Sequence, residues 1–132
     1  MKRVLIVTGS SRGIGAATAR LAAQRGYAVC VNYAHNQMAA QSIADEIKEK
    51  GGQAIAVACD ISSEPEVVRL FESVDKAFGR VTDLVNNAGI LERQARVEEM
   101  DSARLNRIFA TNVTGAFLCA REAVRRLSLI HI

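Results

Sequence analysis

The sequence predicts an α/β fold built on one parallel β-sheet. Short apolar runs rich in β-branched residues, such as residues 4–7, alternate along the chain with longer segments of helical periodicity. A glycine-rich turn joins the first apolar run to the first helix. Four runs separated by helices imply right-handed crossovers and a parallel sheet, and the expected strand order is 3-2-1-4. In this doubly wound arrangement a ligand binds outside the carboxyl ends of strands one and four, where the winding reverses.

The composition supports one globular domain. At 132 residues and 49% hydrophobic content, the chain is long enough to bury a substantial core. The net charge of +3 is small and no aromatic residues alternate with the basic ones, which argues against a nucleic-acid surface. No segment approaches the length of a membrane span, and the apolar run behind the basic N-terminus is too short for a signal peptide. We therefore expect a cytoplasmic protein.

The three cysteines, Cys30, Cys59 and Cys119, lie inside apolar segments and show no C-x-x-C spacing. They are expected to be reduced thiols of the core, and neither a disulfide nor a metal site is indicated.

The first part of the chain predicts three strands and three helices. The strands are residues 4–7, 28–33 and 53–58. Residues 16–23 favour the first helix, which ends at Gly26. The next two helices are recognised by apolar residues on one face, namely Ala40, Ile43, Ala44 and Ile47 in the second and Val67, Leu70, Phe71, Val74 and Phe78 in the third.

Turn and capping residues set the ends of these helices. Gly51-Gly52 ends the second helix and Gly79 ends the third. Ser63 and Glu66 have the spacing of a capping box at the start of the third helix, so each side chain is expected to bond the other residue's backbone N–H.

The second part of the chain predicts one more strand and two separate helices. The strand is residues 83–86, and a polar loop follows at residues 90–97. Helices are expected at residues 98–109 and 112–127. The second of these carries an apolar stripe, formed by Val113, Ala116, Phe117, Ala120, Val124 and Leu127.

Glycines at positions 9, 13 and 15 follow the first strand directly and open the first helix. Glycine lets a backbone turn tightly and approach a pyrophosphate, whose charge is stabilised by the unpaired N–H groups of a helix N-terminus. Strand, glycine-rich turn and helix in this order are typical of a Rossmann-type nucleotide-binding unit. The plain alternative is an ordinary strand-to-helix turn.

The pattern Thr8-Gly9-x-x-x-Gly13-x-Gly15 resembles the cofactor loop of the short-chain dehydrogenase/reductase family. Among its members, the resemblance is to 3-oxoacyl-acyl-carrier-protein reductases and glucose dehydrogenases. It implies a nicotinamide dinucleotide as cofactor and a small-molecule alcohol or ketone as substrate. The residues of the turn expected to bind the cofactor are Gly9, Ser11, Arg12, Gly13, Ile14 and Gly15.

Three further positions match the family. Asp60, with Ile61 after it, follows the third strand, where the family has an aspartate at the adenine ring; its alternative role is to cap the loop. Asn86-Asn87-Ala88-Gly89 matches a family motif in which Asn87, Ala88 and Gly89 line the cofactor groove, and the alternative is a bare turn. Asn112 matches the asparagine of the family's catalytic set, implied to hold a water for proton relay, and the alternative is a helix N-cap.

The end of the second strand bears on the choice of cofactor. Proteins of this fold that prefer NAD usually place an acidic residue there to bind the ribose 2′-hydroxyl. Residues 32–36 contain no acid, so nothing there repels a 2′-phosphate, and Tyr33 at the end of the strand is expected to contact the cofactor. Arg12 can contact that phosphate through a charge-assisted hydrogen bond. We therefore expect NADP(H) in preference to NAD(H).

The chain lacks the family's catalytic Tyr-x-x-x-Lys pair and its serine. The only tyrosines, Tyr27 and Tyr33, are followed four positions later by Val31 and Gln37. We expect residues 1–127 to be an incomplete cofactor-binding domain, truncated before the fifth strand and inactive alone, and residues 128–132 to be a non-family tail. His131 in that tail is not a candidate base.

Two other functions stay open at this level. One is a non-catalytic dinucleotide-binding module, and the other is an S-adenosylmethionine-dependent methyltransferase, which usually needs an acid after the second strand. The resemblance also implies that the full-length parent is a homo-oligomer joined through the last helix. We expect this chain alone to self-associate through the apolar surface left uncovered.

Overall fold

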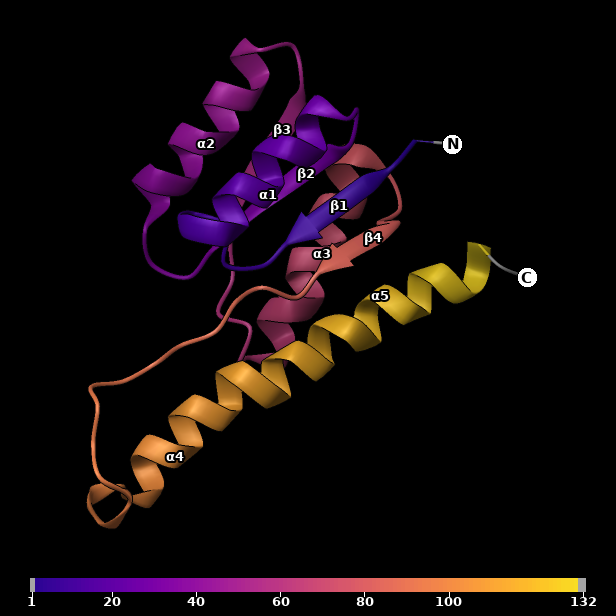
Figure 1. Cartoon of the computed structure of the whole chain (residues 1–132). Helices are drawn as coiled ribbons and strands as arrows, with labels where there is room; N and C mark the ends of the chain where they lie inside the picture. Colours follow the sequence, from indigo (N-terminus) through magenta and orange to yellow (C-terminus); the bar gives the residue numbers. More distant parts are fainter. Residues whose placement is uncertain (1, 131–132) are drawn as a thin grey trace.

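The computed structural model describes residues 2–130 and confirms the Rossmann-type α/β fold (Figure 1). One parallel sheet has the strand order β3-β2-β1-β4, as predicted. Its strands are β1 (Val4–Val7), β2 (Ala28–Tyr33), β3 (Gln53–Ala58) and β4 (Asp83–Val85). The helices are α1 (Gly13–Gln24), α2 (Gln37–Glu49), α3 (Glu64–Phe78), α4 (Ser102–Phe109) and α5 (Ala116–Ile130), with a 3-10 turn at Val97–Glu99 and a π-helical turn at Ala110–Gly115.

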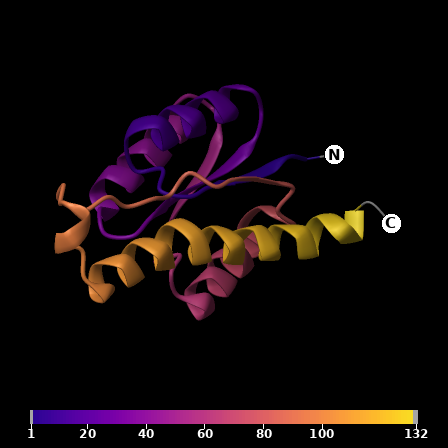
Figure 2. The ribbon, with the colours of Figure 1, turned by 60° about the horizontal axis from the view of Figure 1, so that its bottom comes forward.

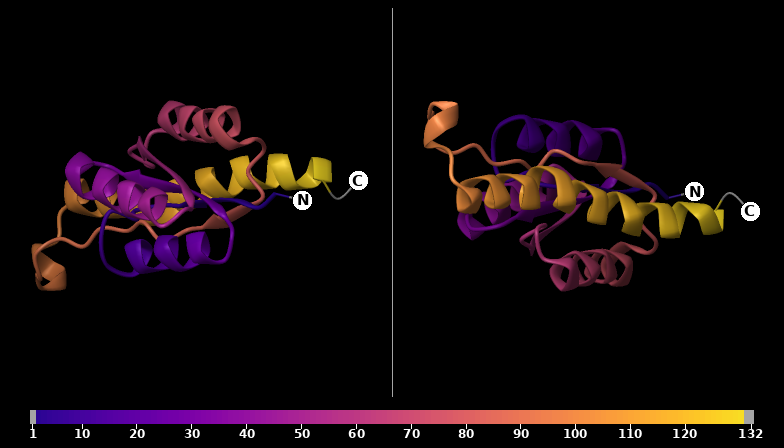
Figure 3. Two further views of the ribbon diagram at one scale, coloured as in Figure 1. Left: turned by 90° about the horizontal axis from the view of Figure 1, so that it is seen from above. Right: turned by 90° about the horizontal axis from the view of Figure 1, so that it is seen from below.

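Helices cover the sheet on both faces (Figure 3). Leu5 and Val7 of β1 pack in the core beneath α1 and α2, whereas Val4 and Ile6 pack in the core beneath α3 and α5. All four side chains are buried. A central parallel strand with both faces covered needs apolar residues at every position, which explains the continuous run at residues 4–7.

The last third of the chain differs from the prediction of two separate helices. Helix α4, the π-helical turn and α5 form one continuous long helix (Figure 2). It begins at Ser102, where the Asp101 carboxylate accepts a hydrogen bond from the N–H of Arg104 at 2.9 Å. The helical periodicity was therefore detected correctly, but the predicted break between residues 109 and 112 is wrong.

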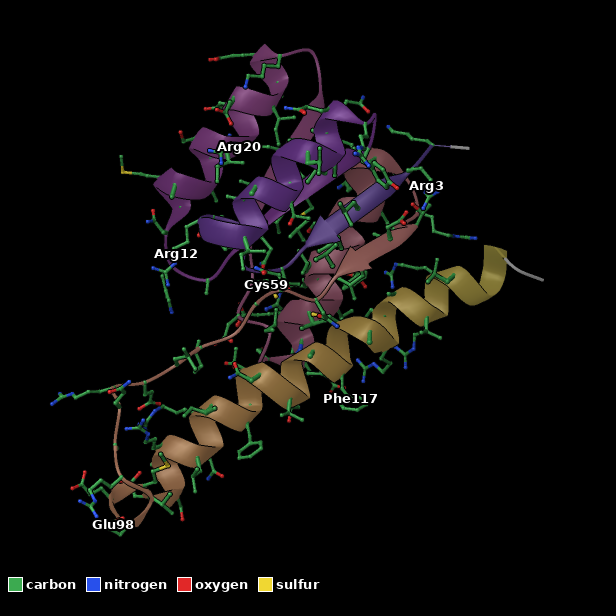
Figure 4. All side chains as sticks on the ribbon, viewed as in Figure 1. Arg3, Arg12, Arg20, Cys59, Glu98 and Phe117 are labelled. Carbon is green, nitrogen blue, oxygen red and sulfur yellow. The ribbon has the colours of Figure 1, made fainter. Side chains whose placement is uncertain are left out.

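Two large residues of the apolar stripe predicted on the last helix are exposed. Phe117 is 74% exposed and Val124 is 60% exposed, and Phe117 points away from the sheet (Figure 4). The buried positions are the small residues Gly115, just before α5, and Cys119 and Ala123 within it, together with the charged Glu122. Small residues let the helix lie close to the sheet and α3, whereas the larger apolar side chains are left on the opposite side. This apolar face of α5 is uncovered within residues 2–130.

A buried charge network joins α5 to α3. Glu122 is 4% exposed and accepts hydrogen bonds from Arg121, Arg125 and Arg126 at 3.1, 2.7 and 3.3 Å. Arg126 also donates to Asp75 of α3 at 2.9 Å. Burial raises the pKa of Glu122, but the hydrogen bonds from Arg121 and Arg126 outweigh this effect and hold that pKa below its ordinary value. The carboxylate is therefore charged at neutral pH.

The cysteines are free and buried, as predicted. Burial raises the pKa of Cys59 to about 12 and the pKa of Cys119 to about 11. Both thiols are protonated at neutral pH and act as core residues. In the part of the chain from residue 2 to residue 130, no helix combines the length and apolarity needed to cross a bilayer.

Candidate cofactor-binding site

The loops that follow β1 and β4 are joined by the side chains of Thr8 and Asn87. Thr8 Oγ1 accepts hydrogen bonds from the backbone N–H groups of Asn87 at 3.0 Å and Ala88 at 2.9 Å. Asn87 Nδ2 donates to the carbonyl oxygens of Thr8 and Gly9, both at 3.0 Å. The two loops therefore form one unit at the carboxyl edge of the sheet. Asn87 acts here as a scaffold that holds the glycine-rich turn.

Asn32, at the carboxyl end of β2, is a structural residue of the site that the sequence analysis missed. It is 2% exposed, and its Oδ1 accepts from Gly9 N at 3.0 Å while its backbone N–H donates to Ser10 Oγ at 3.0 Å. Its Nδ2 donates to the carbonyl oxygens of Val57 and Cys59 at 3.2 and 3.3 Å. Asn32 thus fixes the exits of three strands relative to one another. Its sequence signal is an amide side chain in an otherwise apolar strand.

The glycine-rich turn is closed on its inner side and open on its outer side. A Cβ on Gly15 would lie 2.6 Å from both Gly9 O and Asn87 Nδ2, so no side chain fits there. Gly13 has a φ of +59°, and a Cβ on it would meet nothing within 4 Å. Helix α1 begins at Gly13 and has no acidic residue in its first turn. Its unpaired N–H groups therefore lie at an open turn that favours an anion.

Three of the other predicted residues lie in the turn, and the fourth lies at the end of β2. Arg12 is the N-cap residue of α1, with extended backbone and an exposed side chain, and Figure 4 shows it at the start of that helix. Ile14 is 80% exposed, and Ser11 is half-buried. Tyr33, at the end of β2, is half-buried and packs against the core beneath α1 and α2. A cationic side chain is thus available beside the open turn.

The loop after β3 carries Asp60 and Ile61. Asp60 Oδ1 accepts from Ser62 N at 3.0 Å and from Ser62 Oγ at 2.6 Å, and these bonds hold the pKa of Asp60 below its ordinary value. Glu66 Oε1 accepts from Asp60 N at 3.1 Å, so it supports this loop instead of completing the predicted capping box. Only the other half of that box forms, with Ser63 Oγ accepting from Glu66 N at 3.4 Å. Ile61 is 4% exposed and packs in the core beneath α3 and α5.

Asn112 lies inside the π-helical turn, so its alternative role as a helix N-cap is excluded. Its Oδ1 accepts from Ile90 N at 2.7 Å, and its Nδ2 donates to Ile90 O at 2.8 Å. The two bonds fix the chain as it leaves Gly89. Single π-helical turns within α-helices occur frequently at functional sites.

The fold thus brings the glycine-rich turn, the loop after β3 and the loop after β4 to one edge of the sheet, with Asn112 reaching that edge through Ile90. No set of three metal-ligating side chains occurs in the described part of the chain. His131 lies outside the described residues.

The sequence that forms this site matches a known protein family. The model of the short chain dehydrogenases matches residues 3–129. The chain belongs to this family. The family uses a nicotinamide dinucleotide, and the open glycine-rich turn fits the phosphates of such a group.

The proteins that this chain resembles are about twice as long as the chain itself. The "Uncharacterized oxidoreductase YgfF" of Escherichia coli is 51% identical over 126 residues, covering 96% of this chain and 51% of that protein. "Elsinochrome reductase 1" of Elsinoe fawcettii is 40% identical over 96% of this chain and 47% of its own length. A solved short-chain dehydrogenase/reductase of Serratia marcescens, in a mutant form, matches with a TM-score of 0.89 at 34% identity, covering 95% of this chain and 51% of that one. The chain spans about half the length of the relatives it matches.

Proposed function

We propose that this chain is the dinucleotide-binding half of an NADP(H)-dependent oxidoreductase, which moves hydride between the nicotinamide and an alcohol or ketone. The observation that carries the proposal is the open turn at Gly13. The scaffold of Thr8, Asn32 and Asn87 fixes that turn at the carboxyl end of β1, and the N-terminus of α1 lies directly behind it. An anionic diphosphate is the ligand class that this arrangement favours.

The preference for NADP(H) is supported by charge. The segment between β2 and α2 contains no acidic residue. Arg12, the N-cap residue of α1, is exposed in the glycine-rich turn. A carboxylate at the end of β2 would bind a ribose 2′-hydroxyl and repel a 2′-phosphate. We assign Arg12 as the residue that contacts the 2′-phosphate, and Asp60 and Ile61 as the adenine side of the groove.

Catalysis by this chain alone is not expected, because its 132 residues contain no Tyr-x-x-x-Lys pair to transfer the proton. We place Asn112 in the catalytic set as a positioning residue, since both functional atoms of its side chain are bonded to Ile90. The uncovered apolar face of α5, with Phe117 and Val124 exposed, supports a homo-oligomer of the parent protein.

Fluorescence titration with NADPH and NADH tests the proposal. The unchanged chain should bind NADPH more tightly than NADH. Arg12→Ala should weaken NADPH binding by about tenfold or more, because a hydrogen bond between charged groups is lost, and should leave NADH binding unchanged. Arg25→Ala is the matched control, since Arg25 is exposed at the other end of α1.

Each alternative has its own result. Equal affinities of the unchanged chain for NADPH and NADH would remove the cofactor preference. Binding of neither dinucleotide would refute the proposed function. Binding without turnover by the full-length parent would favour a non-catalytic module.

A further inference from the structure

Gly115, the last residue of the π-helical turn, touches the loop that follows β3. A Cβ on Gly115 would lie 2.7 Å from Ile61 Cγ1, 2.8 Å from Ile61 O and 2.9 Å from Ile61 Cδ1. Real Cβ atoms do not approach other heavy atoms so closely. The backbone of Gly115 is helical, and alanine is a better helix former than glycine. The close contact with Ile61, and not the backbone conformation, therefore explains why position 115 has no side chain.

Neither partner in this contact can retreat easily. Ile61 is 4% exposed and belongs to the core beneath α3 and α5. On the other side, Asn86 Nδ2 donates to Ala116 O at 3.0 Å, which ties the start of α5 to the end of β4. The Arg126–Asp75 pair at 2.9 Å ties the same helix to α3. Because these two bonds tie the helix in place, the shift that an added methyl group requires falls on the Asp60–Ile61 loop.

The same turn holds a second loop at the opposite end of the groove. Asn112, three residues before Gly115, bonds both backbone groups of Ile90. The π-helical turn therefore contacts the chain leaving β3 on one side and the chain leaving β4 on the other. This places it between the two parts of the proposed cofactor groove.

We propose that Gly115 is a positioning residue for the adenosine end of the cofactor: by lacking a side chain, it lets the π-helical turn seat directly on Ile61 and so sets the position of the Asp60–Ile61 loop. This inference rests on the proposed function. The geometry of the adenine side of the groove then depends on the π-helical turn as well as on the Asp60–Ile61 loop.

The test measures the affinity of Gly115→Ala for ADP-ribose by calorimetry, together with its melting temperature. Loss of about one hydrogen bond to the displaced loop should weaken binding roughly threefold to tenfold. Gly52→Ala is the matched control: its Cβ would lie 2.8 Å from Ile47 Cγ2 and 3.2 Å from Ile47 O, but at the amino edge of the sheet. It should lower the melting temperature and leave the affinity unchanged. Equal affinity of Gly115→Ala and the unchanged chain would overturn the inference.

A double-mutant cycle keeps the inference testable if Gly115→Ala alone folds poorly. Ile61→Ala removes two of the three atoms that the new methyl group would meet and leaves Ile61 O at 2.8 Å, so it relieves the contact in part. Gly115→Ala should therefore weaken ADP-ribose binding by a smaller factor in that background than in the unchanged chain. Additive effects of the two substitutions would contradict direct positioning. Failure of the unchanged chain to bind ADP-ribose would instead refute the proposed function, which separates the two failures.

Discussion

The substitution Thr8→Val tests whether the Thr8 hydroxyl holds together the loops after β1 and β4. Thr8 is fully buried, and its hydroxyl oxygen accepts from two backbone N–H groups, those of Asn87 at 3.0 Å and Ala88 at 2.9 Å. Valine has nearly the same shape, so no cavity forms and the packing of the core is kept. The substitution removes only the hydrogen-bonding capacity at the junction between the loops after β1 and β4.

The expected loss of stability follows from those two bonds. Each hydrogen bond of this kind contributes about 0.5–1.5 kcal/mol net, and an unpaired buried N–H costs more. Because Asn87 and Ala88 are half-buried and water reaches them in part, we expect a loss of about 2 kcal/mol in the free energy of unfolding. The affinity for NADPH should fall as well, since the Asn87 amide also holds the carbonyls of Thr8 and Gly9.

Urea denaturation measures this effect. The midpoint should fall while the m-value stays the same, as for a change confined to the native state. The control is Thr18→Val, because the Thr18 hydroxyl donates to Ile14 O at 2.8 Å within α1 and joins no two loops. That variant should change the free energy of unfolding by less than about 0.5 kcal/mol. Equal stability of the two variants would refute the scaffold role of Thr8.

Two further predictions concern the long helix. Because the folded-state pKa of Glu122 lies below its ordinary value, its contribution to stability should be present above the unfolded-state pKa and be lost as pH falls through the folded-state pKa. Glu122→Gln should flatten this part of the curve of stability against pH, measured by thermal melting. An unaltered curve would mean that the ion pairs of Glu122 do not stabilise the fold. The exposed Phe117 should make the chain self-associate, so Phe117→Ser should shift sedimentation profiles toward the monomer. A monodisperse, cooperatively melting monomer of the unchanged chain would contradict this prediction.

Most of the sheet could be predicted from sequence because buried parallel strands carry an unambiguous signal. The run at residues 4–7 and the run at residues 28–33 match β1 and β2. The predicted strand at residues 83–86 is one residue too long, since Asn86 leaves the sheet to bond Ala116 O. The strand order followed from the doubly wound arrangement, which the pattern of any single segment does not specify.

The long helix shows what periodicity alone leaves open. Amphipathic patterns identify an apolar face, but they do not say what covers that face. In α5 the large residues Phe117 and Val124 gave the expected stripe, whereas the contacts are made by Gly115 and Cys119. Close helix packing selects small residues, and a hydrophobicity scale gives glycine little weight.

The sequence predicted where the candidate site lies in the fold, but not which hydrogen bonds hold its loops together. The glycine-rich turn and Asp60 lie at the expected edge of the sheet. The sequence could not show that Asn87 and Asn112 direct their side-chain amides at backbone groups of neighbouring loops. Such partners are distant in the chain, 79 positions away for Asn87 and Thr8, and only the fold brings them together.

Amide NMR spectra recorded during titration with NADPH show whether the turn at residues 9–15 binds the phosphates of a dinucleotide. We expect saturable shifts of the backbone N–H signals of Gly13, Ile14 and Gly15, together with those of Asp60 and Ile61. Signals of α2 residues remote from the carboxyl edge, such as Ile47, should stay in place. Saturable shifts confined to the amino edge of the sheet, or no saturable shift at the turn, would mean that this turn does not bind the phosphates.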